Sequence, residues 1–397
     1  MKDHIKKLML GNGLAQAIQF SSIILLSRLY QPNDFGVLAQ VQSVAMLISI
    51  FCTLQLHLVI PLQKSYEDAC NIISGVQYLC VLFSALFIAF GFFIGDIYLF
   101  SAILAMFLGF INTYNGFYIY SGEFKSLANF YIIRSILIVV TQVIFSLFSI
   151  NYGLIFATLF AEFLSASYLL YKQFQINSPM TFSFNNVLLI VREWKSFSLY
   201  GTVQEIISVA AFYVPLFLFV NKFGEHIGGQ YAMASRLIWA PIILISSSIS
   251  QVLYHSYGKI NPSSVRSLLA SVPYNIFILI LIFSITIWAI GSKVISLVLG
   301  NNWNITAEFI PILLIWGGVF ILSIPFRVFI RTNLLQKYQL FVDFCMICSF
   351  LSVFYFSDFS PSAVVWALAM IALVQNLLLV LISAWQIRMT GVERSII

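Results

Sequence analysis

Charged residues are scarce in this sequence. Of its 397 residues, 9% are Asp, Glu, Lys or Arg, whereas 61% are hydrophobic. A soluble globular domain usually carries about 25% charged residues, so this class is excluded. Continuous apolar runs such as Val37–Phe51 and Ile276–Ile290 recur instead, within stretches of about 20 residues that match the ~30 Å hydrocarbon core of a bilayer. The composition therefore indicates a polytopic membrane protein.

The sequence also lacks the motifs that are typical of catalytic and metal-binding sites. The four histidines lie in no His/Cys/Asp cluster with metal-ligand spacing, and no Gly-rich phosphate loop occurs. Cys345 and Cys348 form a Cys-x-x-Cys pair, but it lies inside an apolar stretch with no second pair, so we interpret both as packing residues. We therefore predict a protein that is not an enzyme and that has no metal or cofactor.

The alternating polar and apolar pattern of a transmembrane barrel is absent as well. The membrane-spanning segments are therefore predicted to be helices, because in lipid each backbone amide must bond within its own segment. The sequence predicts an all-α fold of twelve transmembrane helices, at 9–29, 36–58, 71–95, 97–120, 127–148, 150–171, 197–220, 228–252, 268–290, 306–326, 339–357 and 361–386. A polar linker at 172–196, with an amphipathic stretch at Val187–Val191, separates an N-terminal six-helix bundle (1–171) from a C-terminal one (197–397).

The positive charges sort to one side of these helices. With the N-terminus in the cytoplasm, 15 of the 20 Lys and Arg residues, Arg327 among them, fall at cytoplasmic ends or loops; three fall on the other side and two lie within helices. Positive cytoplasmic loops set the orientation of membrane proteins, so both termini are expected in the cytoplasm. The net charge of +6 is then a topology signal and a contact for anionic lipids, not for nucleic acid.

The two halves carry a weak internal repeat. When the sequence is shifted by 188 positions, Gly13 and Gln16 fall on Gly201 and Gln204, at the starts of the first and seventh predicted helices. Six helices separate the copies, so both run in the same direction. Parallel repeats of this kind place substrate sites between the halves, which predicts a central cavity.

Few ionisable side chains lie at membrane depth, and each needs a partner or water there. They are Arg134, Glu162, Glu205, Arg236 and Asp343. Two interpretations stay open: internal salt bridges, for example Arg134 with Glu162, or a hydrated cavity with fixed positive charge. Arginine suits the second because its planar, permanently charged fork grips phosphate oxygens in pairs. Glu162, Glu205 and His57 are candidates for coupling transport to protons.

A nine-residue motif follows the first predicted helix: Arg28-Leu29-Tyr30-Gln31-Pro32-Asn33-Asp34-Phe35-Gly36. It resembles, throughout, the first outer loop of the Wzx-type O-antigen and polysaccharide flippases, a family of the multidrug/oligosaccharidyl-lipid/polysaccharide exporter superfamily. The segment from Gly229 to Arg236 is similar to the eighth helix of that family. One departure is His57, where many members carry an acidic residue.

The resemblance implies two six-helix bundles around a central cavity, with Arg236 facing the cavity. It implies a flippase that moves an undecaprenyl-pyrophosphate-linked oligosaccharide to the periplasmic leaflet of a bacterial inner membrane by alternating access, coupled to ions or protons. We expect the pyrophosphate at Arg236 and Arg134, and the sugars against Gln16, Gln204 and Tyr213. Membrane lipids and other membrane proteins of glycan assembly are the expected partners.

Two other functions remain open. A cation-coupled multidrug exporter shares this architecture, but it would favour negative charge in the cavity, against Arg134 and Arg236. A membrane-embedded enzyme of glycan assembly would form new covalent bonds and would lose activity when one acidic or histidine residue is changed.

Overall fold

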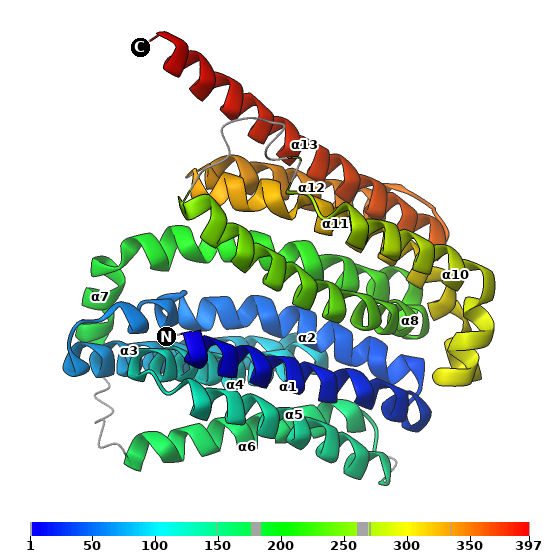
Figure 1. Cartoon of the computed structure of the whole chain (residues 1–397). Helices are drawn as coiled ribbons and strands as arrows, with labels where there is room; N and C mark the ends of the chain where they lie inside the picture. The colour runs from blue at the N-terminus through cyan, green and yellow to red at the C-terminus, as the bar shows by residue number, and fades with distance from the viewer. Residues whose placement is uncertain are drawn as a thin grey trace. The chain divides into compact units, whose positions relative to one another are not determined.

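The structure is a computed structural model that describes residues 2–148, 150–175, 184–259, 269, 271–333 and 335–396. Within those ranges the backbone forms helices joined by turns and loops, without a strand (Figure 1). The predicted all-α fold is confirmed. In chain order the elements are α1 (Lys2–Leu29), α2 (Pro32–Thr53), η1 (Leu56–Leu58), η2 (Ile60–Leu62), α3 (Tyr66–Ile94), α4 (Asp96–Ser121), α5 (Phe124–Ser146), α6 (Gly153–Gln175), α7 (Phe184–Glu193), η3 (Ser196–Gly201), α8 (Thr202–Lys259), α10 (Tyr274–Val298), η4 (Asn301–Trp303), α11 (Asn304–Thr332), α12 (Gln336–Phe356) and α13 (Pro361–Ile396).

Ten helical stretches in the described ranges are long and apolar enough to cross a membrane. One of them, Phe197–Ser250, is 54 residues long, and α8 within it is interrupted at Gly224, whose φ of 82° only glycine adopts readily. This stretch therefore contains two of the predicted helices. When it is counted as two, and α1 is added as the first, the twelve predicted segments are accounted for.

Several predicted helix boundaries differ from the structure, and the end of the second helix is one that bears on a candidate site residue. The second helix ends at Thr53, because Leu54 and Gln55 take left-handed conformations (φ 45° and 57°) and two short 3-10 turns follow. His57 therefore lies beyond the helix, in η1. The predicted amphipathic stretch of the linker is the helix α7, whose Val187 and Ile190 are buried against α3. Part of the linker, at 176–183, lies outside the described residues.

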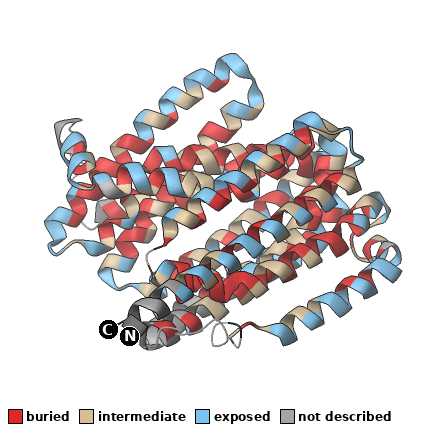
Figure 2. Ribbon diagram, turned by 90° about the horizontal axis from the view of Figure 1, so that it is seen from above, coloured by how far each residue is buried: buried red, intermediate tan, exposed pale blue. Residues whose placement is uncertain are grey.

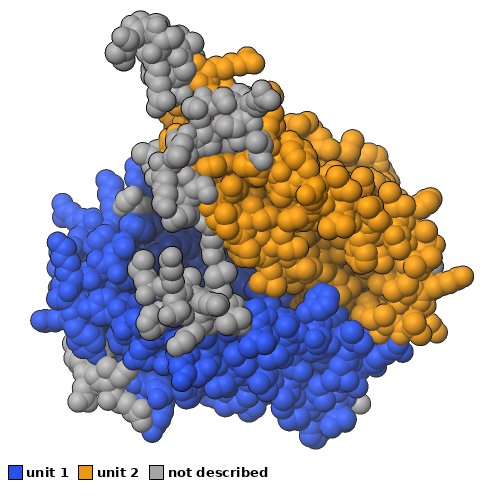
Figure 3. All heavy atoms as spheres, viewed as in Figure 1, with its two compact units in different colours: residues 1–229 blue, residues 230–397 orange. Residues whose placement is uncertain are grey.

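The chain forms two compact units, residues 1–229 and 230–397 (Figure 3). In unit 1 the main helix pairs are α1 with α5, α3 with α4, α2 with α4 and α5 with α6. The first part of α8 also belongs to it, since the Gln40 amide donates a 2.7 Å hydrogen bond to the Asn221 side chain. The domain boundary predicted at 172–196 rests on the polar break between the sixth and seventh predicted helices and stays a prediction.

Unit 2 is built around α11, which packs along α10 and α13, while α12 packs along α13. Gln230 of α8 holds the start of α11: its amide donates to the Asn302 carbonyl (2.6 Å), and its Oε1 accepts from the Thr306 backbone N–H (3.0 Å). That second bond satisfies one of the amides that a helix start leaves free.

Large apolar side chains cover much of the outside of the helices. Phe93, Trp288 and Phe356 are 88%, 80% and 89% exposed, and pale, exposed positions alternate with buried ones along most helices (Figure 2). Exposing such a surface to water would cost free energy, whereas lipid tails solvate it. The chain is a multi-pass membrane protein.

Candidate functional site

Arg134 of α5 and Glu162 of α6 form a bidentate ion pair. Arg134 Nε donates to Glu162 Oε2 at 2.8 Å, and Nη2 donates to Oε1 at 2.6 Å. The Glu162 residue is 4% exposed. The internal salt bridge that we considered as an alternative is therefore present. It brings together two of the predicted site residues and balances their charges within unit 1.

Arg236 lies in unit 2, half-buried on α8, after a fully buried stretch that ends at Ala234. Aromatic contacts to α11 hold this part of α8 on either side of the arginine. The Tyr231 ring packs edge-on against Phe309 with centroids 6.1 Å apart, and Trp239 against Trp316 at 5.4 Å. The position of the Arg236 backbone is thus fixed by packing, while its role toward a substrate stays a prediction.

The remaining predicted substrate and coupling residues lie in unit 1. Gln16 of α1 is half-buried, and its Oε1 is buried without a hydrogen-bond partner in the described part of the chain. On α8, Gln204 is exposed, and Glu205 and Tyr213 are half-buried. An acceptor such as Gln16 Oε1 gains a full hydrogen bond from any hydroxyl that reaches it, because leaving it unpaired is costly.

The motif at 28–36 builds a tight corner between α1 and α2. The Tyr30 hydroxyl donates to the Gln142 carbonyl of α5 at 2.7 Å, and burial raises the pKa of Tyr30 to about 12, which keeps this donor protonated. Pro32 opens α2, and Asp34 accepts from the Gln31 N–H at 2.9 Å in a capping box. Arg28, by contrast, is exposed.

Two glycines allow α2 to approach α8 closely. A Cβ on Gly36 would lie 2.1 Å from the Glu225 carbonyl oxygen, and one on Gly229 would lie 1.7 Å from that of Pro32. Both oxygens belong to backbone that cannot move aside. The motif therefore has a structural function in this protein that its sequence alone did not reveal.

His57 lies at the turn after α2, with its carbonyl oxygen against Gly116 of α4. Its Nδ1 is buried without a hydrogen-bond partner among the described residues, and burial lowers the pKa of His57 from 6.5 to about 4. The imidazole is neutral at pH 7 in this conformation. Proton coupling through His57 stays a prediction and would require this turn to open.

The neutral state of His57 predicts a pH dependence of stability. Because the pKa is about 4 in the folded protein and 6.5 in the unfolded chain, protons favour the unfolded chain. Stability that is present above pH 6.5 is thus lost as the pH falls toward 4. The melting temperature of His57→Gln in detergent should therefore fall less than that of the parent between neutral and mildly acidic pH. An equal fall in the two proteins would contradict a buried, neutral imidazole.

Asp343, singled out in the sequence, belongs to a polar cluster in unit 2 whose other members were not predicted. Arg327 of α11 donates from Nε to Ser323 Oγ (3.0 Å) and from Nη2 to Asn376 Oδ1 (3.0 Å), and Gln375 of α13 donates to Asp343 of α12. Asp343 is 7% exposed. Arg327 was assigned to a cytoplasmic end because the tenth helix was predicted to end at 326, whereas α11 continues to Thr332.

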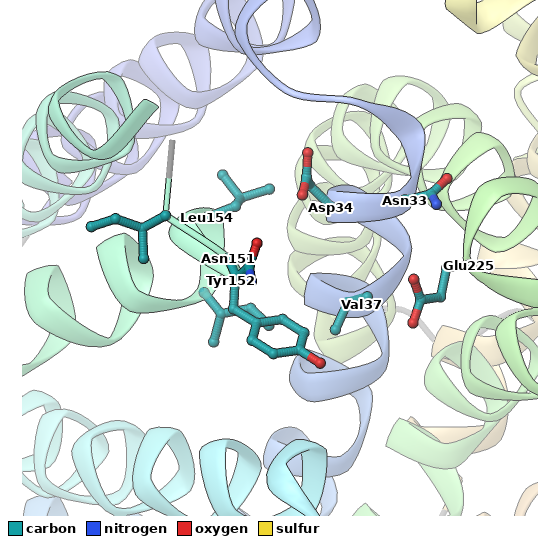
Figure 4. Close-up of a pocket in the computed structure, with 9 residues that line it drawn as sticks. Asn33, Asp34, Val37, Asn151, Tyr152, Leu154 and Glu225 are labelled. Carbon is teal, nitrogen blue, oxygen red and sulfur yellow. The ribbon is translucent and has the colours of Figure 1, made fainter. Parts of the chain in front are cut away.

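A pocket of about 320 Å³ lies within unit 1 where three connections meet (Figure 4). They are the start of α2, the connection between α5 and α6, and the part of α8 just after Gly224. The lining residues are Asn33, Asp34, Val37, Ile150, Asn151, Tyr152, Leu154, Ile155 and Glu225. No pattern in the sequence joins these three segments, which is why the pocket was not predicted.

The described residues contain no group of three or more His, Cys, Asp or Glu side chains that could hold a metal ion. Cys345 and Cys348 are free and exposed on α12.

Comparison with known proteins identifies relatives of this chain. A family model described as polysaccharide biosynthesis protein matches residues 25–308. None of the curated proteins compared with the chain matches it in sequence. Among solved structures, the lipid II flippase MurJ in an inward closed conformation is similar with a TM-score of 0.67 and 13% identity, over 97% of this chain and 90% of that one.

Transporters of the MOP superfamily share the same fold. An inward-facing transporter of the MATE family and MOP superfamily has a TM-score of 0.60 and 14% identity, over 96% of this chain and 94% of that one. A MOP superfamily transporter from Pyrococcus furiosus has a TM-score of 0.57 and 15% identity, over 98% and 96%. These likenesses establish the fold, and the resemblance found in the sequence is confirmed by the family match over more than half of the chain: the protein belongs to the polysaccharide biosynthesis protein family.

Proposed function

We propose that this protein is a flippase that moves an undecaprenyl-pyrophosphate-linked oligosaccharide from the cytoplasmic to the periplasmic leaflet of a bacterial inner membrane. The observation that carries the proposal is a polysaccharide biosynthesis family match on a chain whose fold resembles that of a lipid II flippase. A polar glycan and its charged headgroup cannot cross hydrocarbon unaided, so their transfer requires a hydrated, polar path between helices.

In this proposal Arg236 holds the pyrophosphate, because a guanidinium group binds two phosphate oxygens at once. The sugars contact Gln16, Gln204 and Tyr213, and the unpaired Gln16 Oε1 supplies an acceptor for a sugar hydroxyl. The polyprenyl chain stays in lipid throughout. Rocking of the two six-helix bundles exposes the substrate to one leaflet and then the other.

The ion pair between Arg134 and Glu162 supplies a means of proton coupling. While Glu162 is ionised, it occupies both the Nε and Nη2 donors of Arg134. A proton on Glu162 removes that charge and breaks the pair, so the protonation state of Glu162 is linked to the availability of Arg134 for the pyrophosphate. Glu205, which is half-buried on α8, is a second candidate for this step, and His57 a third.

Cation-coupled multidrug export is the second candidate, because MATE transporters share the fold. The pairing of Arg134 with Glu162 is compatible with export of cationic drugs, since the pair contributes no net positive charge to a cavity.

Deletion of the gene in its own host distinguishes the two functions. If the chain is the flippase, the deletion strain should lose surface polysaccharide, accumulate the lipid-linked precursor in the inner leaflet, and recover on complementation. Unchanged surface polysaccharide together with increased sensitivity to drugs would overturn the proposal in favour of export.

The proposed orientation places both termini in the cytoplasm. We expect reporter fusions after Lys125 and after Lys259 to report the cytoplasm and a fusion at Gly224 to report the periplasm, because positive charge is retained on the cytoplasmic side. Paired phosphatase and fluorescent-protein reporters measure this. A periplasmic signal at Lys259 would contradict the number of membrane-spanning helices predicted for the second half.

A further inference from the structure

The pocket in unit 1 presents polar side chains that have no partner among the residues that the structure describes. Asn33, Asn151 and Glu225 make no side-chain hydrogen bond or ion pair in the described part of the chain, although all three line the same 320 Å³ space (Figure 4). Pockets that bind small molecules have volumes of about 300–1,000 Å³. The space is therefore large enough for one or two sugar rings, and its donors and acceptors are available to a ligand.

The chemistry of the lining favours neutral, hydroxyl-rich ligands. Asp34 and Glu225 are acceptors, the amides of Asn33 and Asn151 both donate and accept, and no Lys, Arg or His lines the pocket. Two carboxylates without a cation repel a phosphate group. Sugar hydroxyls, which donate and accept together, match such a set of carboxylates and amides.

Tyr152 adds an aromatic surface at a fixed position. Its φ of 59° is rare for a residue with a side chain, and its carbonyl accepts from the Ile155 and Phe156 N–H groups at 2.9 and 3.0 Å, where α6 begins. The ring packs edge-on against Phe100 with centroids 5.9 Å apart, yet the residue remains 43% exposed. The free part of the ring provides an apolar face of the kind that packs against the C–H face of a sugar.

The two carboxylates of the pocket, Asp34 and Glu225, lie where the backbone is tightly packed. One oxygen of Asp34 accepts from the Gln31 N–H, which orients the group at the start of α2. Glu225 directly follows the bend at Gly224, and its carbonyl is in contact with Gly36. The pocket therefore depends on the same corner that the sequence motif builds.

The end of the molecule on which the pocket lies follows from chain order. Its residues come from the connections after the first, fifth and seventh membrane segments, and these connections all lie on the side opposite the N-terminus. In the proposed orientation that side is the periplasm.

We infer that this pocket is a saccharide-binding site, which receives the neutral sugars of the transported glycan on the periplasmic side and excludes the pyrophosphate. The inference rests on the proposed function and extends it. Sugars enter a site built from carboxylates, amides and Tyr152, whereas the phosphates stay with arginine. This separation orients the substrate so that its glycan enters the periplasm before its pyrophosphate does.

Binding of the free glycan tests the inference. The probe is the oligosaccharide released by mild acid from the lipid-linked precursor of the host, added to the purified full chain in nanodiscs and observed by saturation-transfer NMR. We expect saturable binding that is about tenfold weaker in Asn151→Ala and in Glu225→Gln. Asp96→Asn, which removes an exposed carboxylate on the same side but outside the pocket, is the matched control.

Two outcomes would overturn the inference: no binding of the glycan to the parent, or equal affinity in the parent and both pocket variants. Failure of the proposed function has a different signature. In that case deletion of the gene leaves surface polysaccharide unchanged. If deletion abolishes export while the pocket variants bind glycan as the parent does, the flippase assignment stands and only the pocket is wrong.

Discussion

Arg236→Ala is expected to abolish glycan export while the protein still inserts in the membrane at its normal level. The substrate pyrophosphate would lose its charged, bidentate partner in a segment where water is scarce, and an unpaired phosphate there is costly. Neighbouring contacts should preserve the helix, since Tyr231 and Trp239 pack on α11 independently of the arginine. Complementation of a deletion strain, with surface polysaccharide and protein level both measured, provides the assay.

Two further variants separate a binding role from a general need for charge. Arg236→Lys should restore export only in part, because an ammonium group keeps the charge but loses the planar fork. Arg331→Ala, which removes an exposed arginine near the end of α11 in the same unit, should export normally. Full export by Arg236→Ala would remove the arginine from the proposed binding site.

The transmembrane helices were predictable because their signal is local. A continuous apolar run of sufficient length can satisfy its backbone in lipid only as a helix, and the sorting of Lys and Arg fixes how many such helices fit. The end of α2 at Thr53 was not predictable in the same way. Leu54 and Gln55 are ordinary helix residues, and their left-handed conformations reflect how the following turns pack against α4.

Residues of the candidate site could be predicted only where a single residue stood out from the sequence around it. A charged residue deep in an apolar run is conspicuous, so Arg134 and Glu162 could be paired before their geometry was known. Arg327 lies close to a helix end, where the sequence indicates a cytoplasmic charge, and only the structure shows its bonds to Ser323 and Asn376. The pocket depends on three segments that are distant in the sequence, and its residues are individually unremarkable residues of helix ends and of one connection.

The motif at 28–36 illustrates how a specific pattern identifies a family without identifying a binding site. Its tyrosine, proline, aspartate and glycine all have structural partners: a carbonyl of α5, the first turn of α2 and the backbone of α8. Substituting Gly36 or Gly229 would therefore be expected to reduce folding before any contact with substrate is lost. Variants of the motif should be interpreted only when protein level is known.

Breaking the ion pair of Arg134 and Glu162 is expected to have the largest effect on stability. Removing one member of a buried pair leaves an uncompensated charge and costs about 3–5 kcal/mol, whereas replacing both with uncharged residues is close to neutral. Arg134→Met and Glu162→Gln should each lower the melting temperature strongly, and the double variant should recover most of the loss. Lys125→Met, an exposed position on the same helix, should have little effect.

The double variant also decides whether the pair has a function beyond folding. If Arg134 binds pyrophosphate when Glu162 is protonated, Arg134→Met/Glu162→Gln should be stable but should export poorly. Glu162→Gln alone, where it is folded, should export without the dependence on the proton gradient that an ionophore reveals in the parent. A stable double variant that exports at the parental level and still responds to the ionophore would show that the pair is only structural. Proton coupling would then have to be sought at Glu205 or His57, because an ion pair that can be deleted without loss of export cannot exchange its partner for the substrate.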